Sequence, residues 1–259
     1  MTTTTDTQRS TEHADRGAGP STGTRDDLRA EALAAGERFA AREGRLGHEE
    51  LTREILTWAA ETFGDGLIVA SNMQDAVLVA LGALARAGVD VLFLDTGYHF
   101  AETLGTRDAV AQVYGVHIVQ AEPDETVAEQ DALRGKDLFA TDPNECCRLR
   151  KVVPLQRTLA RYDAWVTGVR RVEAPTRATT PLVTWDERHG LVKINPIAHW
   201  SDEQIETYIR EHAVLVNPLV GAGYPSIGCA PCTAKPAPGA DPRSGRWAGT
   251  AKTECGLHG

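Results

Sequence analysis

Short apolar runs alternate with helical patterns through the middle of the chain, and this alternation limits the folds that the sequence can adopt. The runs predicted as buried strands are residues 66–70, 89–94, 116–119 and 164–169. Helices are predicted between them, at residues 76–87, at residues 100–114 and after the Cys146-Cys147 pair. Strands that alternate with helices are typical of a parallel sheet covered on both faces. The sequence therefore predicts an α/β fold with a doubly wound, mostly parallel sheet.

Local signals place further elements on either side of this alternation. An amphipathic pattern begins at Leu51 and predicts a helix to residue 63. A β-hairpin is expected between residues 182–185 and residues 191–194. Ser201 begins a capping box, which predicts a helix from there to about residue 212.

The chain of 259 residues is long enough for one large domain. Residues 1–25 are rich in Thr, Ser, Gly and charge, so we expect a disordered tail. Residues 26–216 carry the alternating pattern and form a predicted nucleotide-binding domain. From residue 217 to residue 259 the chain loses hydrophobic periodicity and gains Gly and Pro. We expect a metal site to order this last segment, as part of the same domain.

Ligands on a sheet of this kind bind beyond the carboxyl ends of its strands. Three segments follow predicted strands and are therefore candidate contacts: residues 71–75, 95–97 and 168–171. The first of them joins a strand to a helix, and the amides at such a junction favour an anion or a nucleotide. It has none of the glycines of a Walker loop, so the turn alone is weak support for a nucleotide site.

The charge balance excludes some classes of partner. The chain has 27 basic and 36 acidic residues, a net charge of −9, which argues against a broad nucleic-acid surface. No apolar run reaches the roughly 18–20 residues of a membrane helix, and the first residues lack the apolar core of a secretory signal. We therefore expect a cytoplasmic protein with no nucleic-acid and no membrane partner, whose anionic ligands are held by a local basic cluster.

Arginine is concentrated locally against this acidic background. Residues 148–177 hold eight Lys and Arg but only two acidic residues. Arg170 and Arg171 follow a predicted strand, where ligands bind, and the guanidinium fork suits phosphate and sulfate oxygens. Arg243 and Arg246 occur in the aperiodic C-terminal segment, where surface decoration is a poor explanation for them.

Five cysteines are too few, and their number is odd, for a disulfide scaffold. Cys146 and Cys147 are adjacent, Cys229 and Cys232 form a C-x-x-C, and Cys255 stands alone. Prolines around the C-x-x-C argue against a redox disulfide of the strand-to-helix type. Adjacent cysteines point in different directions, which suits a four-iron cluster better than a compact tetrahedral ion. An iron–sulfur cluster is favoured, with zinc and unligated thiols as the alternatives.

Cys255 lies near the last residue of the sequence and has two interpretations. Either it is an exposed thiol without a role, or it is a nucleophile. The second interpretation follows if the four paired cysteines are ligands, since Cys255 is then the one reactive thiol that remains. A free thiol has a pKa of about 8.5, so a nucleophilic Cys255 needs positive neighbours. Lys252 and His258 are nearby in sequence, and Arg243 and Arg246 lie upstream.

With these features in place, the chain resembles the assimilatory adenylyl-sulfate (APS) reductases, in their bacterial iron–sulfur form. The resemblance extends from about residue 47 to residue 259. Its motifs are residues 94–97, Cys146-Cys147 followed by Arg150-Lys151, residues 167–171, 175–177, 228–232 and 243–246, and the Glu-Cys-Gly-Leu-His of residues 254–258.

This resemblance implies an adenine-nucleotide α-hydrolase-like fold and the reduction of APS to sulfite and AMP, with thioredoxin as electron donor. It implies that Cys255 attacks the sulfate sulfur and carries the S-sulfocysteine intermediate. It also implies that Cys146, Cys147, Cys229 and Cys232 hold a 4Fe-4S cluster with an electrostatic and structural role. The substrate-binding residues that it implies are Ser71, Leu94, Lys151, Gly168, Arg170, Arg177, Arg243, Arg246 and His258.

Each alternative function is distinguished from that of an APS reductase by a feature of the sequence. A reductase of phosphoadenylyl sulfate (PAPS) would use the same mechanism, but such enzymes generally lack the four cluster cysteines. An ATP pyrophosphatase of the same fold carries a Ser-Gly-Gly-x-Asp-Ser loop, and residues 71–75 have neither glycine. They also depart from the Ser-x-Ser-Gly loop of many APS reductases. A non-enzymatic iron–sulfur sensor or a zinc-binding interaction protein would leave Cys255 and the Arg243/Arg246 pair unexplained.

Overall fold

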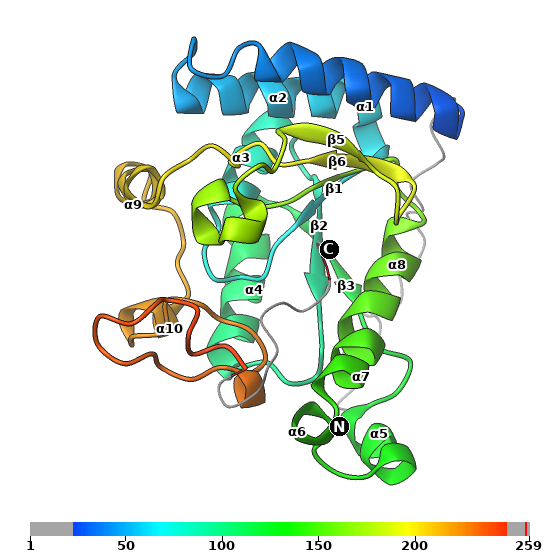
Figure 1. Ribbon diagram of the computed structural model, residues 1–259, viewed down its shortest axis with the longest axis vertical. Coiled ribbons are helices and arrows are strands. Elements are labelled where there is room, and N and C mark those ends of the chain that lie inside the picture. Colours follow the sequence, from blue (N-terminus) through cyan, green and yellow to red (C-terminus); the bar gives the residue numbers. More distant parts are fainter. Residues whose placement is uncertain (1–22, 248–256, 258–259) are drawn as a thin grey trace, which may run out of the picture.

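The computed structural model describes residues 23–247 and residue 257. Its centre is a six-stranded sheet with the strand order β3-β2-β1-β4-β6-β5 (Figure 1). The strands are β1 (Leu67–Ala70), β2 (Asp90–Leu94), β3 (His117–Ala121), β4 (Ala164–Val166), β5 (Val183–Asp186) and β6 (Leu191–Ile194). All neighbours run parallel except β5 and β6, which form an antiparallel hairpin. The predicted mostly parallel sheet and the predicted hairpin are therefore confirmed.

The helices cover both faces of this sheet. They are α1 (Arg25–Ala40), α2 (His48–Phe63), α3 (Val77–Ala85), α4 (Ala101–Tyr114), α5 (Val127–Arg134), α6 (Leu138–Thr141), α7 (Pro143–Cys147), α8 (Val153–Leu159), α9 (Asp202–Glu211) and α10 (Pro218–Gly221). Figure 1 shows α3 and α4 on one side of the sheet and α8 on the other. Among the described residues, no helix has the length and apolar character needed to cross a membrane.

The two faces of the sheet belong to two apolar clusters because side chains alternate along each strand. Val69 and Val166 point into the larger cluster, with α2 and α3. Ile68 and Trp165 point into the smaller one, together with Leu155 of α8. Strands that are buried on both faces read as continuous apolar runs, which is why the sequence pattern identified them.

Several boundaries differ from those predicted. β4 ends at Val166 rather than at residue 169, although Thr167 still donates a backbone hydrogen bond to Ile194 of the neighbouring strand. The predicted helix after Cys146 and Cys147 is present as α8, but the two cysteines themselves end a further helix, α7, which continues through a π-helical turn (Arg148–Val152) into α8. α1 begins at Arg25 with Thr24 as its N-cap, whereas residues 1–22 of the predicted tail lie outside the described residues.

The aperiodic segment after residue 216 is held by hydrogen bonds to the strand-end loops. The amide side chain of Asn217 is fully buried and donates to the carbonyl of Met73 and to the hydroxyl of Thr103, both at 3.1 Å. Further along, the backbone N–H of Ala230 donates to the carbonyl of Tyr98 at 2.7 Å. These polar contacts tie residues 217–230 to the loops after β1 and β2 and to α4. The ordering of this segment by a metal site stays a prediction.

Two helical glycines provide a matched test of this packing. A Cβ at Gly36 of α1 would stand 2.8 Å from the backbone oxygen of Val183, whereas nothing lies within 4 Å of one at Gly105 of α4. We expect Gly105→Ala to raise the free energy of unfolding by about 0.5–1 kcal/mol, because alanine is the better helix former. Gly36→Ala should lower it by about 1–3 kcal/mol, because α1 must move away from β5. Urea unfolding of both variants measures the difference, and equal shifts would contradict the packing of α1 on the hairpin.

Candidate active site

The carboxyl ends of β1, β2 and β4 lie at the same edge of the sheet, because these strands are adjacent and parallel. Ser71 directly follows β1, Leu94 ends β2, and Gly168 lies two residues after β4. The structure therefore brings together the three segments that the sequence singled out as ligand contacts. The carbonyl of Leu94 also bonds to the buried imidazole of His99, with 2.8 Å between Nε2 and the oxygen.

The turn at residues 71–75 uses its amides internally. The N–H of Met73 donates to the hydroxyl of Ser71 and the N–H of Gln74 to the side chain of Asn72, both at 3.2 Å. The N–H of Ala76 donates to the carbonyl of Leu215 at 2.9 Å. Met73 is fully buried and has a φ of 59°, a left-handed conformation that non-glycine residues rarely adopt. The expectation that these amides cradle an anion is therefore wrong for Met73, Gln74 and Ala76.

The four paired cysteines line one cavity. Cys146 and Cys147 reach it from the end of α7, and Cys229 and Cys232 from a 3₁₀ turn at Ala230–Cys232. The other residues around this cavity are Tyr98, Phe139, Pro143, Arg150, Lys151 and Pro231. Thus 81 residues of sequence lie between the two pairs, from Cys147 to Cys229, and the fold brings the pairs together.

The thiols of this cavity affect one another. Burial, together with the three other cysteines, raises the pKa of Cys146 to about 12. Burial also raises the pKa of Cys232, whereas the charges of Lys151 and Arg246 lower it. Four thiols in one cavity, three of them buried, can all ionise only where a cationic group compensates their charge, as bound metal does.

The donor set fits an iron–sulfur cluster. All four donors are sulfur atoms, and each thiolate of a 4Fe-4S cluster binds a different iron, so the ligands need not converge on one point. In residues 23–247 and 257, no group of three or more His, Cys, Asp or Glu side chains is arranged to hold a metal ion.

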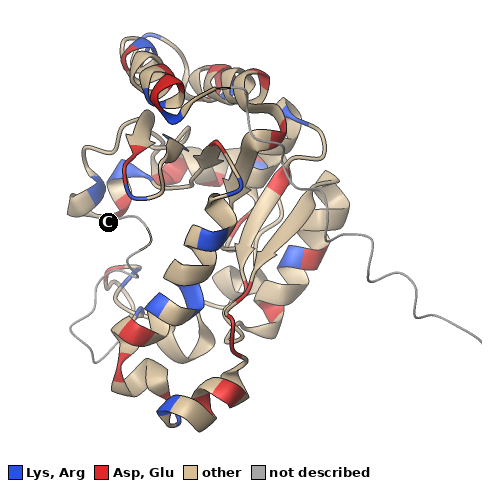
Figure 2. Ribbon diagram, turned by 90° about the vertical axis from the view of Figure 1, so that its right-hand side faces the viewer, with Lys and Arg blue, Asp and Glu red and all other residues tan. Residues whose placement is uncertain are grey.

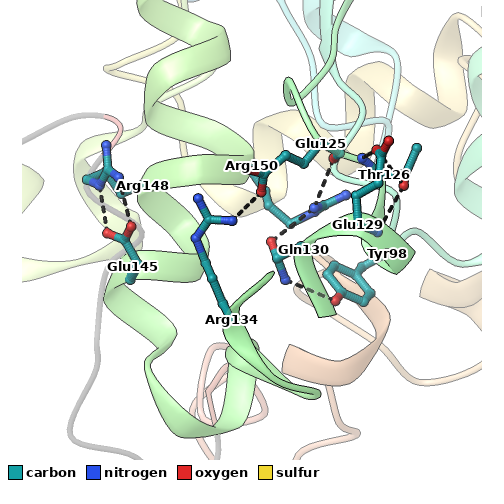
Figure 3. A network of polar contacts seen from close by, with 9 residues as sticks. All are labelled: Tyr98, Glu125, Thr126, Glu129, Gln130, Arg134, Glu145, Arg148 and Arg150. Atoms are coloured by element: carbon teal, nitrogen blue, oxygen red, sulfur yellow. Dashed lines mark hydrogen bonds and ion pairs between the residues drawn. The ribbon is translucent and has the colours of Figure 1, made fainter. Parts of the chain in front are cut away.

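Arg150 joins the cysteine cavity to the loop after β2 (Figure 3). Its side chain is buried and donates from Nε to the carbonyl of Thr96 at 2.5 Å and from Nη1 to Oε1 of Gln130 at 3.0 Å. Its guanidinium lies 5.1 Å from the ring centroid of Tyr98. The same loop contacts a candidate ligand, because 3.2 Å separates Thr96 Oγ1 from Cys229 Sγ. Sequence reasoning noted Arg150 in a motif but gave it no role.

The π-helical turn explains how two successive basic residues both face inward. Arg150 and Lys151 are 3% and 8% exposed. A regular helix turns adjacent side chains about 100° apart, and a π turn alters this spacing, often at functional sites. Arg148, at the start of the turn, instead faces solvent in a bidentate pair with Glu145 (Figure 3). Figure 2 shows basic residues spaced along this turn and α8.

The arginines near the β4 end are paired with carboxylates. Arg170 forms an ion pair with Asp202 at 2.7 Å, and Arg177 forms one with Glu173 at 2.5 Å. Arg171 pairs with Glu43, which ties it to the segment after α1. An anion that binds Arg170 or Arg177 must therefore share the guanidinium with a carboxylate already in place.

Arg246 stabilises the loop that precedes the C-x-x-C. Its Nη1 donates to the carbonyl of Ile227 at 3.2 Å, and a Cβ at Gly228 would come within 2.1 Å of its Nη2. Only glycine leaves room for this guanidinium. Arg243 begins a turn, its backbone N–H donating to Asp241 at 2.6 Å. The charges of Lys151 and Arg246 act on the same thiol, that of Cys232.

Two predicted site residues, Cys255 and His258, lie outside the described residues. Leu257 is described, and it packs against the smaller apolar cluster, as do Ala70 and Leu94 at the ends of β1 and β2. A residue of the predicted catalytic motif therefore lies on the face of the sheet that α8 covers.

Sequence reasoning missed Asp75, a carboxyl group at the end of the turn that follows β1. Burial raises its pKa, the charge of Glu173 raises it further, and Arg170 lowers it. Its Oδ1 accepts a hydrogen bond from the N–H of Val77 at 3.1 Å. Its place after a strand was the available signal, since it stands in a segment predicted to contact ligand.

Comparison with known proteins identifies the family. Residues 66–235, more than half of the chain, match the phosphoadenosine phosphosulfate reductase domain. The chain belongs to this family. Its curated relatives include proteins named adenosine 5'-phosphosulfate reductase, from Rhodococcus opacus (69% identical over 80% of this chain and 87% of that protein) and Mycolicibacterium smegmatis (70% over 79% and 87%). The protein of that name from Mycobacterium tuberculosis is 62% identical over 79% of this chain and 87% of its own.

Solved structures agree on the fold. A phosphoadenylyl-sulfate reductase from Candida auris, in a phosphate complex, superposes with a TM-score of 0.61 at 27% identity, over 83% of this chain and 98% of that one. An FMN adenylyltransferase from Candida glabrata gives 0.53 at 13% identity, over 80% and 71%, which speaks for the fold alone. The expected adenine-nucleotide α-hydrolase-like fold and the family resemblance are confirmed, and the chain is an enzyme of the reductase class.

Proposed function

We propose that this protein reduces APS to sulfite and AMP during sulfate assimilation, with electrons from thioredoxin. The observation that carries the proposal is the cavity in which four cysteines meet Lys151, in a chain 62–70% identical to proteins named adenosine 5'-phosphosulfate reductase. The thiol chemistry requires reduced cysteines, which favours the cytoplasm as its place.

The reaction proceeds in two thiol-transfer steps. The Cys255 thiolate attacks the sulfur of the phosphosulfate, a Cys S–S bond forms, and the S–O bond to AMP breaks with its electron pair on the leaving phosphate. A thiolate of thioredoxin then attacks Sγ of the S-sulfocysteine and releases sulfite. Its second thiol resolves the mixed disulfide, so that the thioredoxin dithiol supplies both electrons and is left as a disulfide.

Different residues at this edge of the sheet would contact different parts of the substrate. Ser71, Leu94, Gly168 and Arg170 would contact the nucleotide at the ends of β1, β2 and β4. The phosphosulfate would be held by the basic residues Lys151, Arg177, Arg243, Arg246 and His258. Cations placed there stabilise the charge that develops on the leaving phosphate, which accelerates the first step. This division is supported by the position of Lys151 in the cysteine cavity and by the packing of Leu257 against the smaller apolar cluster.

Cys146, Cys147, Cys229 and Cys232 would hold a 4Fe-4S cluster. The bound cluster would cross-link α7 to the C-x-x-C segment and contribute an electrostatic field, rather than carry electrons, since thioredoxin already supplies two. Lys151 lines the same cavity and would connect this centre to the anion site. The proposal is supported by the all-sulfur donor set and by its placement beside the strand ends.

PAPS is the second candidate substrate, and the similarity to the Candida auris PAPS reductase favours testing it. The protein should be purified without oxygen, incubated with APS or with PAPS in the absence of reductant, and its intact mass taken. A gain of one SO₃ group on Cys255 with APS alone is the expected result. Transfer from both nucleotides would retain the mechanism but remove the substrate assignment. No transfer from either, with iron still bound, would refute the proposed reaction.

A further inference from the structure

Lys193 presents an ammonium group without a carboxylate partner. It lies on β6, in register with Trp165 of β4 and with Thr184 of β5. Among the residues that the structure describes, its side chain donates no hydrogen bond and forms no ion pair; its contact is with the ring of Trp165, whose centroid lies 5.2 Å from Nζ. Burial lowers the pKa of this half-buried group, so its charge is held at a cost in free energy.

The charged groups around Lys193 do not neutralise it. The carboxylate of Asp186 attracts it but is committed to the hairpin turn, where it bonds to Nδ1 of His189 at 2.9 Å and accepts two backbone N–H groups. The guanidinium of Arg177 lowers the pKa of Lys193 further. Lys193 and Arg177 are both cations and act on each other in a partly desolvated environment. Because Lys193 forms no ion pair of its own in the described residues, this arrangement favours the binding of an anion.

The position of Lys193 connects it to the proposed substrate site. It precedes the last residue of β6, and β6 is parallel to β4, whose end leads to Gly168. Its side chain lies on the face of Trp165, the face whose apolar cluster also includes Leu257. Ala70 and Leu94, which end β1 and β2, pack against the same cluster.

We infer that Lys193 is a further anion-binding residue of the active site, which takes a phosphosulfate oxygen of the substrate together with Arg177. The inference rests on the proposed function for the identity of the anion. Arg170, Arg171 and Arg177 each have a carboxylate in place, so an arriving dianion must compete for them. Lys193 forms no ion pair with a carboxylate of the described residues. A bound substrate anion would therefore be the first group to form an ion pair with it.

Lys193→Met keeps the aliphatic stem and removes the charge, so it tests this role directly. Calorimetry on the iron-containing protein should compare adenosine, AMP and ADP, in which the terminal phosphate of ADP stands unreactively where APS has its sulfate. We expect ADP to bind about 10- to 100-fold more weakly to the variant, as for the loss of a hydrogen bond to a charged group, and adenosine to bind unchanged. A matching loss for AMP assigns Lys193 to the α-phosphate, and a loss for ADP alone assigns it to the sulfate position.

Two further variants separate charge from structure. Lys193→Arg should restore most of the ADP affinity. Lys235→Met is the matched control, because Lys235 is exposed and its Nζ also lies 5.2 Å from an aromatic centroid, that of Tyr224; it should change no affinity. Unchanged ADP binding by Lys193→Met, or an equal loss for adenosine, would overturn the inference. Turnover of APS by the wild-type protein tests the proposed function separately, and nucleotide binding without turnover would refute that function while leaving Lys193 as an anion-binding residue.

Discussion

Cys229→Ser is expected to remove bound iron and APS-reducing activity together. Cys229 is 7% exposed in the cysteine cavity, and its Sγ contacts the hydroxyl of Thr96. Serine is nearly the same size and can keep that contact, so the change should spare the local fold. A neutral hydroxyl does not replace a thiolate as an iron ligand, because iron–sulfur clusters are held by deprotonated cysteines. The expected iron and acid-labile sulfide contents of the variant are near zero.

Metal analysis and sulfite release on the same anaerobic preparations measure both effects. Cys255→Ser is the matched control, since it removes a cysteine outside the cavity and should keep wild-type iron. Far-ultraviolet circular dichroism and urea unfolding report whether the Ser variant stays folded, which the hydrogen bonds of Asn217 and Ala230 lead us to expect. An iron-free but fully active variant would show that the cluster is dispensable. Zinc in place of iron in the wild-type protein would refute the cluster itself.

The strands were predictable from sequence because burial on two faces leaves an unmistakable pattern. β1 is an apolar run and β2 is apolar after its first residue, Asp90, and both lie within one residue of the predicted bounds. The hairpin forms where it was expected. Ser201 caps α9 with Gln204, as its capping box predicted. These elements depend on local interactions and on the hydrophobic pattern, and both can be recognised from the sequence alone.

The side-chain partners at the site were not predictable, because they depend on tertiary contacts. The sequence identified the arginines after β4 but not that Glu173 and Asp202 already occupy them. It treated residues 71–75 as a source of free amides, whereas Ser71 and Asn72 use them in local turns. It contained no sign of the π turn that brings Arg150 and Lys151 inward together, because a single inserted residue leaves no periodic signal over so short a helix.

The four paired cysteines were the exception among the predicted site residues. The close spacing within each cysteine pair indicated a shared centre before the fold was known, and the structure brings both pairs to one cavity. Lys193 shows the opposite case. A lysine within a predicted strand has no local signature of function, and its role became apparent only because it forms no ion pair within residues 23–247 and 257 while the nearby Asp186 is bonded to His189.

Cys255→Ser is expected to abolish sulfite release while nucleotide binding and iron content stay at wild-type values. A serine hydroxyl is far less acidic than a thiol and is a weak nucleophile without a dedicated base, so the S-sulfo intermediate should not form. Removal of a covalent nucleophile typically costs several orders of magnitude, and we expect turnover to fall at least about 1,000-fold. ADP affinity should not change, because the proposed anion contacts come from Lys151, Lys193 and the arginines.

The three readouts of this variant discriminate between roles for Cys255. Lost turnover with full ADP binding and full iron is the signature of a nucleophile. Lost turnover together with lost iron would make Cys255 a ligand and leave one cysteine of the cavity without a partner. Retained turnover would exclude it as the nucleophile and direct attention to the cavity thiols, among which burial raises the pKa of Cys146 and of Cys232 and so makes them less reactive. That last outcome is the least compatible with the site, because none of the four can serve as both cluster ligand and free nucleophile.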